Sequence, residues 1–518
     1  MSYDIYGQVP DMSSRKTAEN DSENAFADAL RKSSSTKLTE NGAHAFSTTG
    51  DALVDLFATI GALRNGDNSL DRLRAKIDAA WMVDPQLTMR CLFYARDVRG
   101  GLGEREIFRK AVYYCAMAHT EEMRRNLQLI PEYGRWDDMF ALIGTPLEEE
   151  MWLIIRSQLA KDTLNAANGD SDVSLCAKWM PSIDTSSKKT VNLAKYCALN
   201  MGMSQYTYKR YIRFIRKHLR LLEQDMSAKR WKEIDYSKLP SQAHMRHTKA
   251  FFRNDEGRYR SYLEKVTKGE AKVNTGTLFP YELVERLYDP VSQEGIDHNK
   301  AIETMWNNLP DYVENGGNVM VVADTSGSMY GRPMSVSTSL AMYFAERNHG
   351  PFGGLYMTFS ERPEIIEIRG GTLYDRYKQV MHGPWGQNTN LYAVFDFLAY
   401  VAVQAKCRRD EMPKSIIIIT DMEIDRCESV GAARWNTIVD QIAEKYNELG
   451  YDMPNLVFWN VASRQDTFLA RGNRKGVQMV SGSSASVFKA VLGFANGMTP
   501  YDAVKQVLNA ERYQAIKV

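Results

Sequence analysis

The sequence has few cysteines, and none of them are arranged as zinc ligands. Six cysteines are spread over 518 residues without any C-x-x-C pair. Zinc cages need such pairs, and disulfide-stapled domains need a denser spacing, so the pattern argues against both. We expect small, buried free thiols in a reducing compartment. The six are Cys91, Cys115, Cys176, Cys197, Cys407 and Cys427.

Long apolar runs and catalytic patterns are also missing. No stretch approaches the roughly 18 uninterrupted apolar residues of a membrane helix, and the opening residues MSYDIYGQVPDMSSRK lack the apolar core of a signal peptide. We therefore expect a cytoplasmic protein. No Ser-His-Asp order, paired catalytic carboxylates or phosphate loop stands out, which favours a protein that is not an enzyme. The glycine-rich GGLGER segment follows a helix-like stretch instead of a strand, so it does not predict a phosphate cradle.

What is present is typical of a globular protein with more than one domain. A hydrophobic fraction of 44% and a charged fraction of 25% fit folded domains, and the length predicts two to four of them. The formal net charge is only +1. Residues Ser187 to Thr275, however, carry 21 Lys or Arg against 8 Asp or Glu. Their excess of 13 means that the remainder carries about 12 net negative charges.

The pattern of apolar residues divides the chain into four parts. Residues 1–38 are polar, with one short amphipathic patch at Ala25 to Leu30, and are predicted to form a mobile arm. Residues 39–288 show helical periodicity and predict an all-α, HEAT-like array of stacked hairpins, although no fixed-period repeat is visible. Residues 289–317, with two prolines and a glycine pair, are predicted to be a linker. Residues 318–518 predict an α/β domain.

The helical part contains a strongly basic segment. A helix is predicted from Tyr206 to Met226, with an apolar stripe on one face and cations on another. Such a face is most often simply solvated, but here no acid appears before Glu223, which favours binding of nucleic acid phosphates. The cations that we predict to contact RNA are Lys209, Arg213, Arg216, Lys217, Arg220, Arg246 and Lys249.

Several other residues of the helical part have competing interpretations. The aromatic residues between Trp231 and Tyr262 could stack on bases, but their spacing favours a core. His244 and His247 fit a cationic surface better than a metal site. Arg96, Asp97, Arg99 and Arg105 are expected to pair within the helical array. Trp136, Asp137 and Asp138 fit an aromatic anchor followed by acids at a helix start better than a catalytic acid pair.

From Gly316 onward, strands and helices alternate. Buried strands are predicted at 319–323, 355–359, 415–420 and 456–461, with helices at 334–347, 391–404 and 434–449, and a final strand and helix at 476–481 and 485–494. This alternation is typical of a doubly wound parallel sheet. In such sheets ligands bind beyond the carboxyl ends of the strands, where the strand order reverses.

Oxygen-bearing side chains follow two of these strands. The segment VMVVADTSGSM ends a strand at Asp324 and then presents Ser326 and Ser328, and IIIITDME ends another at Asp421. Thr389 stands just before a predicted helix. These segments resemble the metal-ion-dependent adhesion site of a von Willebrand factor A domain. The resemblance implies that Ser326, Ser328 and Thr389 touch Mg²⁺ or Mn²⁺, that Asp324 and Asp421 act directly or through water, and that an acidic residue of a partner completes the coordination. Glu423 either assists this site or caps a loop, and we favour the cap.

Both halves together resemble a known family. The segments FYARDVRGGLGER, IPEYGRWDDM, AKWMPS, YTYKRYIRFIRKHLRLLE, LPSQA, VADTSGSM and ITDMEID are similar to those of Ro autoantigen (TROVE-module) RNA-binding proteins, and most of all to an uncharacterised group among them. The resemblance implies a ring of helical repeats shut by the α/β domain and acting as a monomer. It also implies a small non-coding or misfolded RNA as the partner, in a ribonucleoprotein.

Two functions of different classes follow. The first is a non-enzymatic RNA-binding protein that holds structured RNA on its basic helices and carries a divalent-metal adhesion site. The second is a protein-interaction scaffold whose metal site binds an acidic residue of a partner.

Overall fold

The computed structural model describes residues 35–63, 69–219, 221–313, 317–359, 362–383, 390–425, 438–494 and 497–518. A helix-rich N-terminal part is followed by an α/β domain with a mixed, mostly parallel sheet. Among the described residues, none of the helices combines the length and apolar composition that crossing a bilayer requires.

The N-terminal part opens with a short hairpin and continues as a series of helices. Its strands are β1 (Thr36–Leu38) and β2 (His44–Phe46). Its α-helices are α2 (Ala52–Ile60), α3 (Ser69–Val83), α4 (Pro85–Arg96), α5 (Arg105–Ala118), α6 (Thr120–Arg124), α7 (Ile130–Tyr133), α8 (Glu148–Asn168), α9 (Cys176–Trp179), α10 (Lys188–Asn200), α11 (Gln205–His218), α12 (Leu222–Ser227), α13 (Ser241–Thr267), α14 (Pro280–Val284) and α15 (Gln293–Asn307). Short 3-10 helices are η2 (Leu127–Leu129), η3 (Trp136–Leu142), η4 (Trp231–Glu233) and η5 (Tyr236–Lys238).

Several helices begin where the sequence supplies a capping side chain. The Asp51 carboxylate accepts a hydrogen bond from the Val54 amide at 3.0 Å, and Asp84 does the same for Leu87 at 2.8 Å. Ser204 caps α11 by accepting from the Thr207 amide. Each cap satisfies an amide at a helix start that has no partner within the helix.

The α/β domain contains one six-stranded sheet in the order β5-β4-β3-β6-β7-β8. Its strands are β3 (Val319–Asp324), β4 (Leu355–Phe359), β5 (Ile365–Glu367), β6 (Ser415–Thr420), β7 (Asn455–Asn460) and β8 (Val477–Ser481). Its helices are η6 (Gly327–Met329), α16 (Arg332–Arg347), α17 (Leu373–Met381), α18 (Leu391–Ala405), η7 (Arg409–Glu411), α19 (Ile438–Glu448), α20 (Val487–Leu492), α21 (Pro500–Leu508) and η8 (Glu511–Tyr513).

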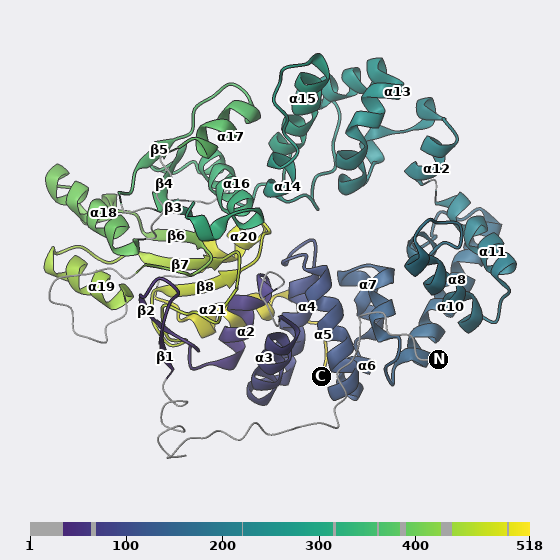
Figure 1. Ribbon diagram of the computed structural model, residues 1–518, viewed down its shortest axis with the longest axis horizontal. Helices are drawn as coiled ribbons and strands as arrows, with labels where there is room; N and C mark the ends of the chain where they lie inside the picture. Colours follow the sequence, from purple (N-terminus) through teal and green to yellow (C-terminus); the bar gives the residue numbers. More distant parts are fainter. Residues whose placement is uncertain are drawn as a thin grey trace.

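The strand order reverses between β3 and β6. From β3 the chain adds β4 on one side, and β6 then pairs with β3 on its other side, parallel and in register from Val319 with Ser415 to Ala323 with Ile419. Helices cover both faces, with α18 and α19 on the outer side and α16 and α20 toward the helical part (Figure 1). Strands β3 and β6 are almost fully buried, as expected for central parallel strands. Their carboxyl ends form the predicted location for a ligand.

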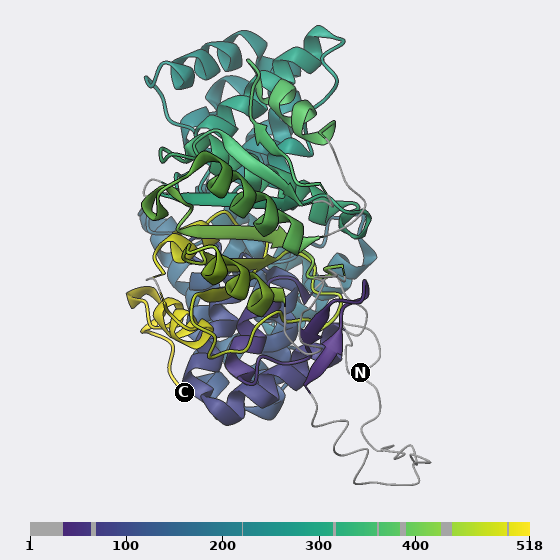
Figure 2. The same cartoon turned by 90° about the vertical axis from the view of Figure 1, so that its left-hand side faces the viewer.

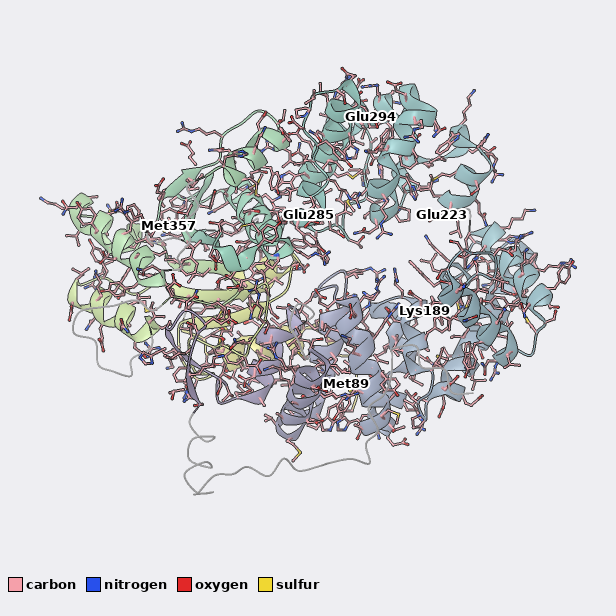
Figure 3. All side chains as sticks on the ribbon, in the orientation of Figure 1. Met89, Lys189, Glu223, Glu285, Glu294 and Met357 are labelled. Atoms are coloured by element: carbon pink, nitrogen blue, oxygen red, sulfur yellow. The ribbon has the colours of Figure 1, made fainter. Side chains whose placement is uncertain are left out.

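Both ends of the helical series contact the α/β domain. At one end α2 packs on β8 and α21, and at the other end α14 packs on α16. The helical series therefore begins and ends in contact with the α/β domain. In Figure 3, Lys189, Glu223 and Glu285 lie toward the middle of the molecule. The first contact is very close, since a Cβ atom at Gly61 would lie 2.8 Å from the backbone of Gly482. Only glycine permits this approach of α2 to the end of β8.

The two chain ends add reciprocal contacts between the domains. The β1–β2 hairpin lies against the α/β domain, where Phe46 and Phe468 exchange backbone hydrogen bonds (Figure 2). The C-terminal segment lies against the helical part. There Arg512 donates to both carboxylate oxygens of the buried Asp97, and the Tyr513 hydroxyl donates at 3.1 Å. Asp97 was expected to pair within the helical array. It accepts from the Arg99 and Gly100 amides there, but its ion-pair partner, Arg512, comes from the far end of the chain.

Three further expectations need correction. The predicted linker 289–317 contains helix α15, capped by Ser292 and buried through Ile302, Met305 and Trp306. The basic helix predicted over 206–226 is two helices, because Leu221 has an extended backbone. The predicted arm overlaps β1, while Ala25 to Leu30 lies outside the described residues. For helix α15, the missed signal was the three-four spacing of its apolar residues.

Candidate metal crevice and candidate RNA surface

The first predicted metal loop leaves the end of β3. Asp324 is fully buried and accepts a hydrogen bond from the Ser326 amide at 2.9 Å, which turns the chain sharply. The Ser326 and Ser328 hydroxyl oxygens lie 3.0 Å apart. The alternating Asp-x-Ser-x-Ser pattern therefore brings two hydroxyls together beside a buried carboxylate.

The second predicted loop joins the same crevice. The Thr420 hydroxyl at the end of β6 donates to Asp324 Oδ2 at 2.6 Å, and the Glu423 amide donates to Asp421 Oδ1 at 3.2 Å. Between them Met422 has a φ of 72°, a left-handed conformation that costs energy for a side chain of this kind. Thr420 was not among the predicted site residues, although its place beside Asp421 at a strand end was a usable signal.

The crevice places two acidic groups in a poor environment for negative charge. Burial raises the pKa of Asp324, and the neighbouring Asp421 raises it further. Burial also raises the pKa of Asp421, against the lowering effect of Ser328 and of the Arg464 guanidinium. Arg464 donates to the Ser328 carbonyl, so it stands at the rim of the crevice. A cation bound here would relieve the repulsion between the two carboxylates.

The donor set fits a hard cation. Asp421 Oδ2 is buried and has no hydrogen-bond partner in the described part of the chain, which is the situation of an oxygen that a metal ion would satisfy. Within the same ranges no group of three or more His, Cys, Asp or Glu could hold an ion. The Ser326 and Ser328 hydroxyls are further oxygen donors of the kind that a hard cation prefers. The predicted ligand Thr389 lies outside the described residues.

Glu423 holds the N-terminal hairpin beside the crevice. Its buried carboxylate accepts from the Glu40 amide at 2.7 Å, and its carbonyl accepts from the Asn41 side chain at 2.9 Å. The Thr39 hydroxyl donates to the next carbonyl, that of Ile424. Of the two roles considered for Glu423, these contacts match the loop cap.

The cations of α11 separate into exposed and structural groups. Arg213 is 72% exposed and lies 4.0 Å from Asp184, and Lys209 forms a closer ion pair with the same carboxylate at 2.6 Å. Lys217 is exposed. Arg220 lies outside the described residues. On α13, Arg246 and Lys249 are exposed, and Lys249 lies 4.3 Å from the centre of the Tyr288 ring.

Arg216 is placed differently from its neighbours. Its guanidinium donates to the carbonyls of Ala177, Lys178 and Met180 and to the Ser182 hydroxyl. Burial lowers the pKa of this half-buried group. Its donors are used within the protein, so we correct its assignment from an RNA contact to a support of residues 177–182, which are the end of α9 and the start of the loop after it.

The aromatic residues of η5 and α13 form a core and not a stacking surface. Tyr236, Phe251, Tyr259 and Tyr262 are buried around His244, as their spacing predicted. His244 is itself fully buried, with Nε2 2.9 Å from the Tyr259 hydroxyl. Burial lowers its pKa to about 4, so it is neutral at pH 7. Its predicted place on a cationic surface was therefore wrong.

The acidic pair at the start of η3 serves structure. Asp138 is fully buried and accepts from Arg96 at 2.7 Å and from Arg109 at 2.6 Å. It also accepts from the Arg135 amide, directly before η3. This geometry agrees with the predicted acids at a helix start and with pairing of Arg96 within the helical part.

Comparison with known proteins assigns most of the chain to families. The model of Domain of unknown function (DUF2828) matches residues 39–160 and 153–319, more than half of the chain. The chain belongs to the DUF2828 family. A second model, Domain of unknown function (DUF7788), matches residues 318–516, so the two models meet where the sheet begins.

Two relatives illustrate the similarity. Uncharacterized protein L728 of Acanthamoeba polyphaga mimivirus is 31% identical over 512 residues, covering 91% of this DUF2828 chain and 87% of the relative. The crystal structure of the Deinococcus radiodurans RO (RSR) protein covers 82% of this chain and 93% of its own, with 16% identity and a TM-score of 0.43.

Proposed function

We propose that this DUF2828 protein is a non-enzymatic RNA-binding protein, a Ro-like component of a ribonucleoprotein that acts as a monomer. The observation that carries the proposal is the exposed positive charge of α11 and α13. Arg213, Lys217, Arg246 and Lys249 present their charges to solvent. Such cations neutralise phosphates and release counterions, which gives affinity with little sequence reading. Structured small RNA is the expected ligand, recognised mainly by its shape.

The test is a pair of charge reversals that spares the structural arginine. Arg213→Glu combined with Lys217→Glu should greatly weaken binding of structured RNA, measured by fluorescence anisotropy. The slope of log affinity against log salt should become shallower by about 1 for each phosphate that is no longer neutralised. The matched control is Arg369→Glu with Arg408→Glu, since these side chains of the α/β domain are 76% and 71% exposed. Equal RNA affinity in the two double variants would refute the proposal.

We further propose that the crevice is a divalent-metal adhesion site. Asp324, Ser326, Ser328 and Asp421, with the predicted Thr389, would hold Mg²⁺ or Mn²⁺. The bound cation would supply the positive charge that attracts an acidic ligand. The buried and unpartnered Asp421 Oδ2 among the described residues supports this assignment. Isothermal titration with Mg²⁺ should give binding in the unmodified chain and none in Asp324→Ala.

A protein-interaction scaffold is the second candidate. It is favoured by Tyr330, which is 89% exposed and directly follows the loop that carries Ser326 and Ser328. An exposed tyrosine beside a cation is a suitable anchor for a protein partner with an acidic residue. This function predicts a protein partner that is lost with EDTA and in Asp324→Ala while RNA binding is unchanged.

A further inference from the structure

A small cavity lies beside the exposed cations of α11. Its volume is about 190 Å³, and it is formed between α11, the loop before α10 and Gln224 of α12. Its apolar wall includes Pro181, Tyr208 and Ile212, all buried. Lys209, Arg213 and Asp184 provide its polar side. The cavity is therefore a concave site with one apolar wall and a charged rim.

The loop that forms this cavity is held in place from two sides. Arg216 donates to two carbonyls of α9, to the Met180 carbonyl directly after it and to the Ser182 hydroxyl. The Tyr208 hydroxyl donates to the Pro181 carbonyl at 2.8 Å. These contacts hold residues 177–182 against α11, and the ion pair with Lys209 links Asp184 to the same helix. A ligand would therefore meet a preformed site and would not have to order the loop.

The charged rim presents a defined order of donors and acceptors. Lys209 Nζ lies 2.6 Å from Asp184 Oδ2, and the Arg213 guanidinium approaches the same oxygen at 4.0 Å. Among the described residues, Asp184 Oδ1 accepts no hydrogen bond and the Gln224 side-chain amide has no partner. A lysine donor thus stands beside two carboxylate acceptors, at the edge of an apolar wall.

The geometry points to a pocket for one unpaired guanine base of the RNA, an inference that rests on the proposed RNA binding. The Watson–Crick edge of guanine presents one acceptor, O6, followed by two donors, N1–H and N2–H₂. Lys209 matches the acceptor, and the two oxygens of Asp184 match the donors. Adenine, cytosine and uracil present other orders. The base would pack on the apolar wall, and Arg213 would remain beside the adjoining phosphate.

The experiment compares single-stranded RNAs of equal length that differ at one position. A uridine oligonucleotide with one guanosine should bind about ten-fold more tightly than the same oligonucleotide with adenosine, and inosine, which lacks the N2 amino group, should fall between them. Asp184→Asn should abolish this preference, because an amide offers a donor where guanine needs an acceptor. Affinity for the adenosine oligonucleotide should not fall in this variant, since a negative charge beside two cations is removed.

Asp172→Asn is the matched control, because Asp172 is also exposed and paired with a lysine, Lys161, but does not line the cavity. It should keep the guanine preference. Equal affinity for all oligonucleotides in the unmodified chain, or a preference retained in Asp184→Asn, would overturn the pocket. If Arg213→Glu with Lys217→Glu still abolishes binding of structured RNA in that case, the proposed function stands without the pocket. If no RNA binds at all, both are overturned.

Discussion

The crevice at the ends of β3 and β6 and the cationic surface of α11 are both rich in polar groups, but they hold them in opposite ways. Asp324 and Asp421 are buried, and backbone and hydroxyl donors fix their positions. Arg213 and Lys217 are exposed. A buried charge has a large effect on stability because it has lost its water, whereas an exposed one has little effect until a ligand arrives. A substitution at an exposed cation of α11 can thus change ligand binding without changing stability, whereas a substitution in the crevice changes both.

The largest loss of stability is expected at Asp138 of the helical part, because this carboxylate is buried like those of the crevice. Asp138→Ala leaves Arg96, only 2% exposed, without its carboxylate partner. The free energy of unfolding should fall by about 3–5 kcal/mol, measured by urea denaturation. Asp184→Ala, at an exposed carboxylate, is the control and should cost less than about 1 kcal/mol. Similar losses in the two variants would contradict the difference in stability between buried and exposed charges.

The next largest change in stability is expected when Mg²⁺ binds in the crevice. Mg²⁺ at a hundredfold excess over its Kd should raise the free energy of unfolding by about 2.7 kcal/mol, because only the folded chain assembles the ligands. Thermal unfolding with and without Mg²⁺ measures this. Asp324→Asn should remove the response, and Asp410→Asn, at a 71% exposed carboxylate, should keep it. A Mg²⁺ response of equal size in both variants would mean that the cation binds elsewhere.

The pH dependence of the free energy of unfolding tests whether the buried His244 ring stays neutral in the folded protein. The pKa of His244 is about 4, below its ordinary 6.5, because burial disfavours the protonated ring. As the pH falls below 6.5 the unfolded chain takes up a proton and the folded chain does not, so stability is lost on acidification. Between about pH 7.5 and pH 5 this loss is about 2 kcal/mol.

His244→Phe should reduce that loss by the same amount in urea denaturation at the two pH values. His382→Phe, at an exposed histidine, is the matched control. An unchanged pH dependence in His244→Phe would show that this ring becomes protonated in the folded protein.

The smallest effect separates two arginines of one helix. Arg216→Met should lower the free energy of unfolding by about 1–2 kcal/mol, because three carbonyls and a hydroxyl lose their donor. Arg213→Met should leave stability within about 0.5 kcal/mol and weaken RNA binding. Thermal unfolding and anisotropy, applied to both variants, give the two readouts. A stability loss at Arg213 equal to that at Arg216 would remove the distinction between exposed and structural cations.

The α/β domain was predictable in its parallel strands and in most of its crevice, but not in β5, the short antiparallel strand at the edge of the sheet. The two central strands are short runs of apolar residues that lead directly into a carboxylate, and parallel strands bring their carboxyl ends to one edge. The positions of Asp324 and Asp421 follow from that rule. Of the missed residues, Thr420 stands beside Asp421 at the end of β6, which was a usable signal. Arg464 acts through a contact between separate loops, which no local pattern contains.

The alternation of strands and helices, the amphipathic character of α11 and the excess of positive charge follow from the amino-acid order, because they depend on residues close together in the chain. Which charges remain exposed follows from the packing of distant segments. Arg213 and Arg216 are three positions apart and chemically alike, yet only Arg216 meets carbonyls of α9 and of the loop after it, nearly forty residues earlier. Likewise the partner of Asp97 is Arg512, at the far end of the chain. Such partners are chosen by packing between distant segments, and local periodicity carries no information about them.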